Sequence, residues 1–257
     1  MNKNKKNKII VVGGKGGVGK TTISAIIVKL LVQNNENLLV IDADPVISLT
    51  HTLGEKPEMT IGDYREILIG SNEEKKSAIK RPMKTIIREM LIESSKGYHL
   101  LPMGRSEAAG CFCGINEMLR FGIAKLCGEY DITLIDCEAG IEQVNRRAVH
   151  HIDNLILLTD TSKRGMETLV QLRDIAVKHN EGNPINVNVI VNTIQNKEEE
   201  EGIIQYATDL GLEVIGSVPE DVNVRNYNRK GMPLFDLPDN SPAVVSLKEI
   251  FSRIDAQ

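Results

Sequence analysis

A glycine-rich stretch near the N-terminus constrains the fold more than any other feature of this sequence. The apolar run Ile9–Val12 leads directly into Gly13–Thr22, and a helical pattern begins at Lys20. Residues Gly14 to Thr21 match the pattern G-x-x-x-x-G-K-[ST], which requires a strand before it and a helix after it. Glycines let successive backbone N–H groups approach a polyphosphate, and the helix N-terminus adds partial positive charge. The stretch therefore predicts a phosphate-binding loop within an α/β fold.

Individual side chains of this loop have distinct expected roles toward a bound nucleotide. Lys20 would neutralise the β- and γ-phosphate oxygens, the Thr21 hydroxyl would bind Mg²⁺, and Thr22 would reach the α-phosphate. The alternative is a glycine-rich turn without a ligand, which the lysine and the two flanking elements argue against. The residues expected to contact ATP or ADP in the loop are Gly14, Lys15, Gly16, Gly17, Val18, Gly19, Lys20, Thr21 and Thr22.

Short β-branched runs alternate with helical patterns along the rest of the chain, which predicts βαβ units and a mostly parallel sheet. We expect about seven strands flanked by helices on both faces, in a single P-loop NTPase domain over residues 8–257 after a flexible basic tail over residues 1–7. The expected strands are Lys8–Val12, Asn37–Ile41, Tyr98–Pro102, Ile132–Asp136, Asn154–Leu158, Asn186–Asn192 and Glu213–Val218. The expected helices are Lys20–Val32, Lys84–Glu93, Ile115–Cys127, Ile141–His150, Arg164–His179, Lys197–Asp209 and Ala243–Ile254. The charged stretch Thr60–Pro82 is interpreted as irregular.

Two acidic motifs follow predicted strands and complete the expected nucleotide site. Asp42-Ala43-Asp44-Pro45 comes after the second strand, and Asp136 ends the strand Ile132–Asp136. Carboxylates at the carboxyl ends of parallel strands beside a P-loop commonly hold Mg²⁺. We therefore expect Asp42 and Asp136 to hold the Mg²⁺ shell, and Asp44 to orient the attacking water. Each aspartate taken singly could instead cap the helix that follows it.

Composition excludes several classes of function. The 257 residues include 31 Lys+Arg against 35 Asp+Glu, a net charge of −4, which provides no basic excess for gripping nucleic acid. The longest apolar runs have four or five residues, whereas crossing a bilayer takes about twenty. The lysine-rich N-terminus has no apolar region behind it that would form a secretory signal, and the four cysteines then predict a reducing compartment. We expect a cytoplasmic protein that binds neither nucleic acid nor membrane.

A Cys-x-Cys pair is the most informative feature outside the nucleotide motifs. Cys111-Phe112-Cys113 offers two thiolates, whereas zinc takes four ligands in a tetrahedron and Ni²⁺ accepts four in a square plane. A two-fold dimer would bring two such pairs face to face and supply four sulfurs. The alternatives are two unrelated thiols, or a disulfide between them that a reducing compartment disfavours. Cys127 and Cys137 are interpreted as packing residues.

The additional lysine of the loop, Lys15, makes Gly14–Thr22 resemble the deviant Walker A motif of the MinD/ParA/nitrogenase-iron-protein group. This resemblance implies that Lys15 reaches the nucleotide of a partner chain in an ATP-bound homodimer, and acts in catalysis with Lys20 and Asp44. The acidic motifs resemble the two switches of the group. Asn192, after its predicted strand, and Pro219 resemble the adenine contacts, although Asn192 could instead be a loop cap. The correspondence runs from residue 8 to about 222.

The cysteine region narrows the resemblance further. Gly110-Cys111-Phe112-Cys113-Gly114 and the stretch from Cys137 to Arg147 look like those of the CooC-type nickel-insertion ATPases, which mature carbon monoxide dehydrogenase, and of their AcsF-type relatives for acetyl-CoA synthase. This resemblance implies a Mg²⁺-dependent ATPase whose dimer holds Ni²⁺, or Zn²⁺ in vitro, on Cys111 and Cys113 of two chains and delivers nickel to the client enzyme. Glu138 and Glu142 stand where partitioning ATPases usually carry a proline-containing switch.

Three other functions stay open. A partitioning or positioning ATPase would use ATP-driven dimerisation to bind DNA or membrane, but the net charge and the mixed charges near the C-terminus disfavour it. An ATP-gated iron–sulfur electron donor would use interfacial cysteines, although donors of this kind carry two cysteines far apart in sequence. A nucleotide-gated metal store would bind the metal without turnover.

Overall fold

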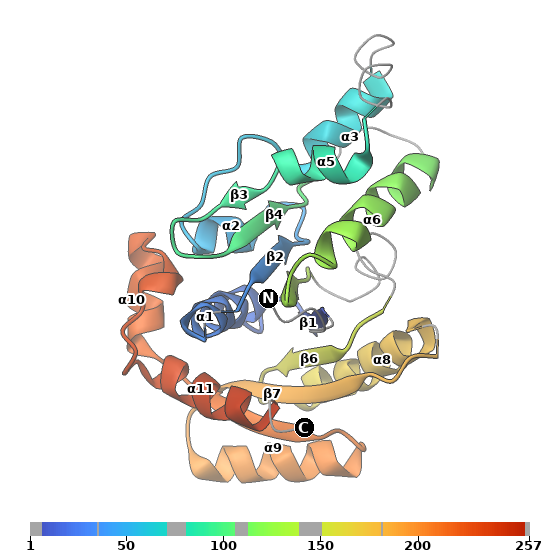
Figure 1. Ribbon diagram of the computed structural model, residues 1–257. Helices are drawn as coiled ribbons and strands as arrows, with labels where there is room; N and C mark the ends of the chain where they lie inside the picture. Colours follow the sequence, from blue (N-terminus) through green and yellow to red (C-terminus); the bar gives the residue numbers. More distant parts are fainter. Residues whose placement is uncertain are drawn as a thin grey trace.

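The computed structural model of the chain describes residues 7–34, 36–70, 81–105, 113–138, 151–180 and 182–254. Within these residues the backbone forms one α/β fold in which a sheet lies between two layers of helices (Figure 1). The strands of the sheet follow the order β3-β4-β2-β5-β1-β6-β7-β8. Their bounds are β1 (Lys8–Gly14), β2 (Leu38–Asp42), β3 (Ile92–Glu93), β4 (His99–Pro102), β5 (Ile132–Asp136), β6 (Asn154–Thr159), β7 (Asn186–Ile194) and β8 (Val214–Pro219).

Two hydrophobic clusters, one on each face of the sheet, hold the helices in place. Along β1, Ile9 and Val11 join one cluster, whereas Ile10 and Val12 join the other, because successive side chains of a strand point to opposite faces. Residues of α3, α5, α6, α8 and α9 pack in the first cluster and residues of α1, α2 and α11 in the second. The helix bounds are α1 (Lys20–Gln33), α2 (Ser48–Thr52), α3 (Ile61–Gly70), α5 (Met83–Glu89), α6 (Cys113–Cys127), α8 (Lys163–His179), α9 (Lys197–Asp209), α10 (Val222–Lys230) and α11 (Pro242–Ile254), with a 3₁₀ turn η1 (Leu234–Asp236).

The sheet is parallel except at one edge. β1 lies between β5 and β6, and every strand pair is parallel apart from the antiparallel pair of β3 with β4. The predicted single α/β P-loop fold with a mostly parallel sheet is therefore confirmed, with eight strands rather than about seven. Because parallel strands all end at the same edge of the sheet, the loops after β1, β2 and β5 meet there.

The predicted helix Lys84–Glu93 is wrong in its last residues. Helix α5 ends at Glu89, and Ile92–Glu93 forms the extra strand β3. Gly97 adopts φ 98° in the turn that follows, and its N–H donates to the carbonyl of Ser94. This tight turn brings Ile92 opposite Leu100 of β4, so pairing with a neighbouring strand replaces the last turn of the helix.

The stretch Thr60–Pro82, interpreted as irregular, begins with the helix α3. The Asp63 carboxylate accepts hydrogen bonds from the N–H and the hydroxyl of Thr60, which caps the start of this helix. Ile61, Tyr64 and Leu68 recur at helical spacing and are buried. The charges between them concealed this apolar face in the sequence. Residues 71–80 and the predicted helix Ile141–His150 lie outside the described residues.

The chain ends in a helix packed against the core, as the sequence indicates. One face of α11 packs against α1 and β8 and buries Ala243, Val244, Leu247, Ile250, Phe251 and Ile254, whereas Val245 is exposed. No helix in the described part of the chain is long and apolar enough to cross a membrane. Residues 1–6 of the predicted tail lie outside the described residues, whereas the Asn7 amide donates to the carbonyl of Tyr130 and the hydroxyl of Thr133.

Candidate functional site

The glycine-rich loop lies where β1 ends and α1 begins, at the carboxyl edge of the sheet (Figure 1). Gly14 adopts φ 147°, and a Cβ atom there would overlap the carbonyl oxygen of Leu158 in the neighbouring strand β6. The loop borders a cavity of about 420 Å³, which is also lined by Lys20, Thr21, Thr22 and Asp44. The Lys20 ammonium donates to the carbonyl of Lys15 at 2.9 Å, so it lies folded back over the loop. Burial lowers the pKa of Lys20, and the charge of Asp136 partly offsets this effect.

Two of the predicted Mg²⁺-binding residues meet beneath this cavity. The Thr21 hydroxyl donates to Oδ2 of Asp136 at 3.0 Å, and the Ser24 hydroxyl donates to its Oδ1 at 2.7 Å. Asp136 is fully buried, and burial raises its pKa to about 7 despite these hydrogen bonds. A hydroxyl beside a buried carboxylate is an oxygen donor set that suits Mg²⁺, and a divalent cation would favour the ionised form. The residues present therefore fit the ion.

The first acidic motif lies beside Asp136 because β2 and β5 are neighbours. Asp42 is directly opposite Asp136 in the sheet register. Its Oδ2 accepts hydrogen bonds from the N–H and the hydroxyl of Thr50, at 2.8 and 2.7 Å. Burial raises the pKa of Asp42, although the bonds from Thr50 oppose the rise. Thr50 thus orients Asp42 and was not singled out from the sequence, since nothing in the residue pattern marks it.

Asp44 is held by a turn of its own segment. Its Oδ1 accepts from the Val46 N–H at 2.9 Å and its Oδ2 from the Ser48 hydroxyl at 2.7 Å. Ile47 lies in this turn with φ 49°, which is unfavourable for a β-branched residue. A strained turn that presents a carboxylate to the phosphate cavity suits the water-orienting role expected of Asp44.

Lys15 is exposed on the loop, and Asp160, which the sequence analysis did not single out, lines a cavity next to the loop. Although burial opposes it, hydrogen bonds from Ser162 and the charge of Lys15 lower the pKa of Asp160. Asp160 directly follows the apolar strand β6, which is the same signal that marked Asp136. In this chain Lys15 therefore has a carboxylate of its own chain nearby.

A second cavity, of about 340 Å³, adjoins the loop and brings Asn192 and Pro219 together. The Asn192 amide nitrogen donates to the carbonyl of Val18 at 2.9 Å, which leaves its amide oxygen as an acceptor for an amino group such as that of adenine. Thr193 adopts φ 61° beside a register shift between β7 and β8. This bulge shifts the pairing by one residue between Asn192 and Ile194, and Thr193 lines the cavity.

Asp221 connects the two helices that close this second cavity. One of its carboxylate oxygens accepts from the Asn223 N–H at the start of α10. The other accepts from the Ser241 hydroxyl and from the Ala243 N–H in the first turn of α11. Its lowered pKa reflects these hydrogen bonds, which outweigh burial. Asp221 was also missed, since serving two helices at once depends on their tertiary arrangement.

The cysteine pair is only partly within the described structure. Cys111 lies outside the described residues, and Cys113 is the first residue of α6, where only the backbone is described. Among the side chains that the structure does describe, no three His, Cys, Asp or Glu residues cluster as a metal site. Cys127 and Cys137 are buried, and burial raises the pKa of both thiols, that of Cys127 to about 11. Both therefore suit the packing role expected of them.

Replacing Gly19 with alanine tests how closely the loop and the base cavity fit. Gly19 adopts φ 90°, and a Cβ atom there would overlap the amide nitrogen of Asn192. We expect the variant to bind ATP roughly ten- to a hundredfold more weakly, because the strain and the displaced Asn192 together cost about 1–3 kcal/mol. Isothermal titration calorimetry measures this loss. Gly202→Ala on α9, where a Cβ meets no neighbour, is the control, and an unchanged affinity in Gly19→Ala would contradict the fit.

Known proteins resemble this chain in sequence and in fold. A family model described as the CobQ/CobB/MinD/ParA nucleotide binding domain matches residues 9–234. An uncharacterised ATP-binding protein of Methanocaldococcus jannaschii is 38% identical over 96% of this chain and 98% of its own length. The carbon monoxide dehydrogenase accessory protein CooC of Rhodospirillum rubrum is 29% identical over 91% of this chain and 90% of its own. The crystal structure of the cell division ATPase MinD of Pyrococcus furiosus, 18% identical, covers 97% of this chain and 98% of its own with a TM-score of 0.71.

Proposed function

Because the chain belongs to the CobQ/CobB/MinD/ParA nucleotide-binding family, we propose that it is an ATP-hydrolysing nickel metallochaperone. Two chains close around ATP, and Cys111 and Cys113 of each chain hold one Ni²⁺ ion between them as cargo. The client is carbon monoxide dehydrogenase, acetyl-CoA synthase or another nickel enzyme of the cytoplasm. The observation that carries the proposal is the Cys-x-Cys pair in a chain similar to the CooC accessory protein.

The nucleotide chemistry rests on residues whose geometry is described above. Thr21, Asp42 and Asp136 would hold Mg²⁺, which would supply positive charge to the phosphates. Lys20 exchanges the Lys15 carbonyl for phosphate oxygens. Asp44 orients the attacking water, and Lys15 of the partner subunit supplies a second positive charge to the phosphates. Asn192 accepts a hydrogen bond from the adenine amino group.

A direct chain of hydrogen bonds supports coupling between the phosphates and the cysteine segment. The Ala43 N–H donates to the carbonyl of Asp136, and the Met103 N–H donates to the carbonyl of Asp42, each at 2.9 Å. From Met103, at the end of β4, the chain continues toward Cys111. Loss of the γ-phosphate therefore alters the hydrogen bonds that hold the start of the cysteine segment. The contact between the two chains then loosens, and the metal is released.

Size-exclusion chromatography with light scattering and metal analysis tests this proposal. Reduced protein loaded anaerobically with Ni²⁺ or Zn²⁺ should form, with Mg·ATP, a dimer that contains about one metal ion per two chains. The Cys111→Ser/Cys113→Ser variant should lose this metal because no thiolate remains to bind it, whereas Cys127→Ser serves as the matched control. Metal at wild-type stoichiometry in the double variant would contradict the proposal.

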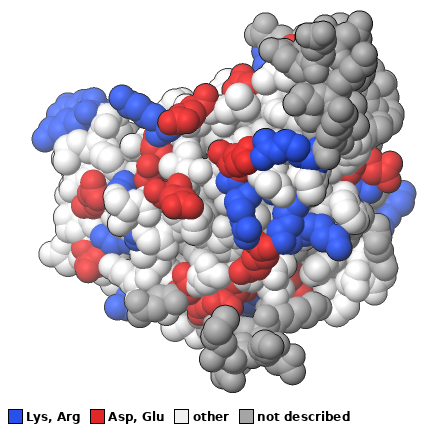
Figure 2. Space-filling model, turned by 45° about the horizontal axis from the view of Figure 1, so that its top comes forward, with Lys and Arg blue, Asp and Glu red and all other residues white. Residues whose placement is uncertain are grey.

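A partitioning or positioning ATPase is the second candidate, favoured by the likeness of the fold to MinD. Against it, Lys and Arg side chains lie among Asp and Glu side chains over the described part of the face shown in Figure 2, and the net charge of −4 provides no basic excess for nucleic acid. In the same chromatography experiment, this candidate predicts an ATP-dependent dimer without cysteine-bound metal. A salt-sensitive shift of DNA in the presence of ATP would then support it.

A further inference from the structure

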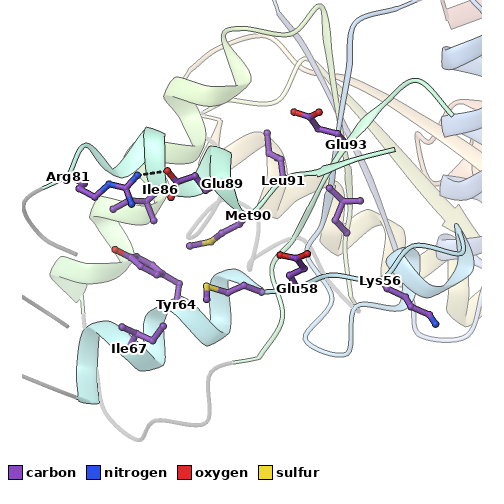
Figure 3. A pocket seen from close by; sticks show the side chains of 12 residues that line it. Lys56, Glu58, Tyr64, Ile67, Arg81, Ile86, Glu89, Met90, Leu91 and Glu93 are labelled. Atoms are coloured by element: carbon purple, nitrogen blue, oxygen red, sulfur yellow. Dashed lines mark hydrogen bonds and ion pairs between the residues drawn. The ribbon is translucent and has the colours of Figure 1, made fainter. Parts of the chain in front are cut away.

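A third cavity, of about 790 Å³, lies apart from the nucleotide site, between α3, α5 and β3 (Figure 3). It is larger than the phosphate and base cavities, and none of the residues lining it lines either of them. Its apolar wall includes Tyr64, Ile67, Ile86 and Met90. Neither the nucleotide chemistry nor the cysteine pair uses this wall.

The cavity runs along the edge of the sheet. β3 is the outermost strand, and its only partner in the described sheet is β4. Leu91 packs against one hydrophobic cluster and Ile92 against the other, so these neighbours point to opposite faces. A cavity that is lined by Leu91, Ile92 and Glu93 therefore borders the outer edge of the strand and not a single face of the sheet. The unpaired edge of a sheet accepts an additional strand through its backbone N–H and C=O groups.

A buried polar group in the wall favours a ligand here. Tyr64 is only 7% exposed, and its hydroxyl has no hydrogen-bond partner within the described structure. An unpaired buried hydroxyl costs on the order of 1–3 kcal/mol. In Figure 3 Tyr64 borders the same space as Met90. A peptide group bound in the cavity would provide the missing partner.

Charged side chains around the cavity form an ion pair at one end and are mainly acidic at the other. Arg81 and Glu89 form an ion pair at one end. Glu58 and Glu93 lie at the other end, and Lys56 points away from them (Figure 3). Glu58 is exposed, and the imidazole of His99 lies 3.9 Å from the Glu93 carboxylate. These two carboxylates favour a basic side chain on a ligand that also fills the apolar wall.

We infer that this cavity and the free edge of β3 form a docking site for an extended segment of a partner protein, with an apolar anchor beside a Lys or Arg. The apolar side chain enters the cavity against Met90, and the base faces Glu58 and Glu93. Helix α3, which borders the cavity, also contacts the segment that leads from β4 toward the cysteines. The Gly62 N–H donates to the Met103 carbonyl at 2.7 Å. The inference depends on neither nickel nor ATP hydrolysis.

Selection of peptides on the full-length protein tests this inference. Random 12-residue peptides displayed on phage are enriched on the wild-type chain and on Glu58→Lys/Glu93→Lys in parallel. We expect the wild type to enrich sequences with an apolar residue two positions from a Lys or Arg and no Pro between them, because alternate residues of an extended segment face the same side. Synthetic versions should bind the charge-reversal variant at least tenfold more weakly, and replacing the peptide's base with Glu should restore binding. Glu198→Lys/Glu201→Lys on α9 is the matched control for the change in net charge.

A second variant separates docking from folding. Tyr64→Phe removes the unpaired hydroxyl at almost constant volume, so the melting temperature should rise while the selected peptides bind several-fold more weakly. ATP affinity should stay unchanged in every variant. No enrichment, enrichment of acidic or helix-patterned peptides, or equal binding to wild type and charge reversal would overturn the inference. A change in self-association in place of peptide binding would overturn it too, since the occupant would then be a second copy of the chain.

Discussion

The Lys15→Ala variant is expected to bind ATP with nearly wild-type affinity but to hydrolyse it on the order of a thousandfold more slowly. The Lys15 side chain is exposed and does not line the phosphate cavity of its own chain, so removing it leaves the cis contacts intact. A cation supplied by a partner accelerates phosphoryl transfer by this order because it stabilises the developing charge. Phosphate release and light scattering with Mg·ATP measure the loss of turnover and of the dimer. Lys20→Ala should differ by losing ATP binding itself.

Mixing two inactive variants tests whether Lys15 acts on the nucleotide of the partner chain. Lys15→Ala binds ATP but lacks the trans lysine, whereas Lys20→Ala has Lys15 but no functional phosphate site. In a mixed dimer the second chain supplies its Lys15 to the nucleotide of the first, so part of the activity should return. Lys178→Ala on α8 controls for the loss of one exposed charge. If Asp160→Asn reproduced the defect and mixing restored nothing, Lys15 would act within its own chain, through its neighbour Asp160.

The Asp136→Asn variant is expected to be more stable than the wild type in the absence of Mg²⁺ and nucleotide, and to have lost hydrolysis. Burial raises the pKa of Asp136 from 3.8 to about 7, so between these values the folded chain binds a proton that the unfolded chain releases. The wild type therefore loses stability as the pH rises from about 4 to 7, by an amount on the order of a few kcal/mol. An asparagine can accept a hydrogen bond from one of the Thr21 and Ser24 hydroxyls and donate to the other, and it does not titrate.

Thermal unfolding in EDTA from pH 5 to 8 measures this difference, which should grow up to about pH 7 and then level off. Mg²⁺ requires the ionised carboxylate, so the affinity of the wild type for Mg·ATP should rise over the same interval. Asp174→Asn, an exposed aspartate on α8, should show neither effect. A variant less stable than the wild type at pH 8 would contradict the prediction, because it would mean that Lys20 already compensates the buried charge.

Regular elements were predictable wherever a short-range pattern carries the information. All seven predicted strands are present, and α9 has its predicted bounds. The helix α3 was missed because its buried residues are only every third or fourth residue of a charged stretch. β3 was missed because two residues form a strand only when β4 lies beside them. Such pairing depends on a turn whose effect no local pattern reveals.

The meeting of the glycine-rich loop and the acidic motifs at one edge of the sheet was predictable for a comparable reason. Gly14–Thr22 is continuous in sequence, and each acidic motif follows an apolar strand, so parallel strands bring them to one edge of the sheet. Thr50 and Asp221 could not be assigned in this way, whereas Asp160 follows the apolar strand β6 and carries the same signal as Asp136. The roles of Thr50 and Asp221 depend on which neighbour each side chain meets after folding, and Asp221 is the clearest case because it joins two helices.

By itself, the sequence determined the P-loop fold, the composition of the phosphate site and the pair of cysteines that suggests a shared metal. These follow from residue type and spacing, which act over a few residues or through the common direction of parallel strands. Only the tertiary structure decided that burial raises the pKa of Asp136 to about 7, that the Asn192 amide nitrogen donates to Val18 and leaves its oxygen as an acceptor, and that the outermost strand of the described sheet adjoins a cavity. Burial, amide orientation and cavities arise from contacts between distant segments, which exist only once the chain has packed.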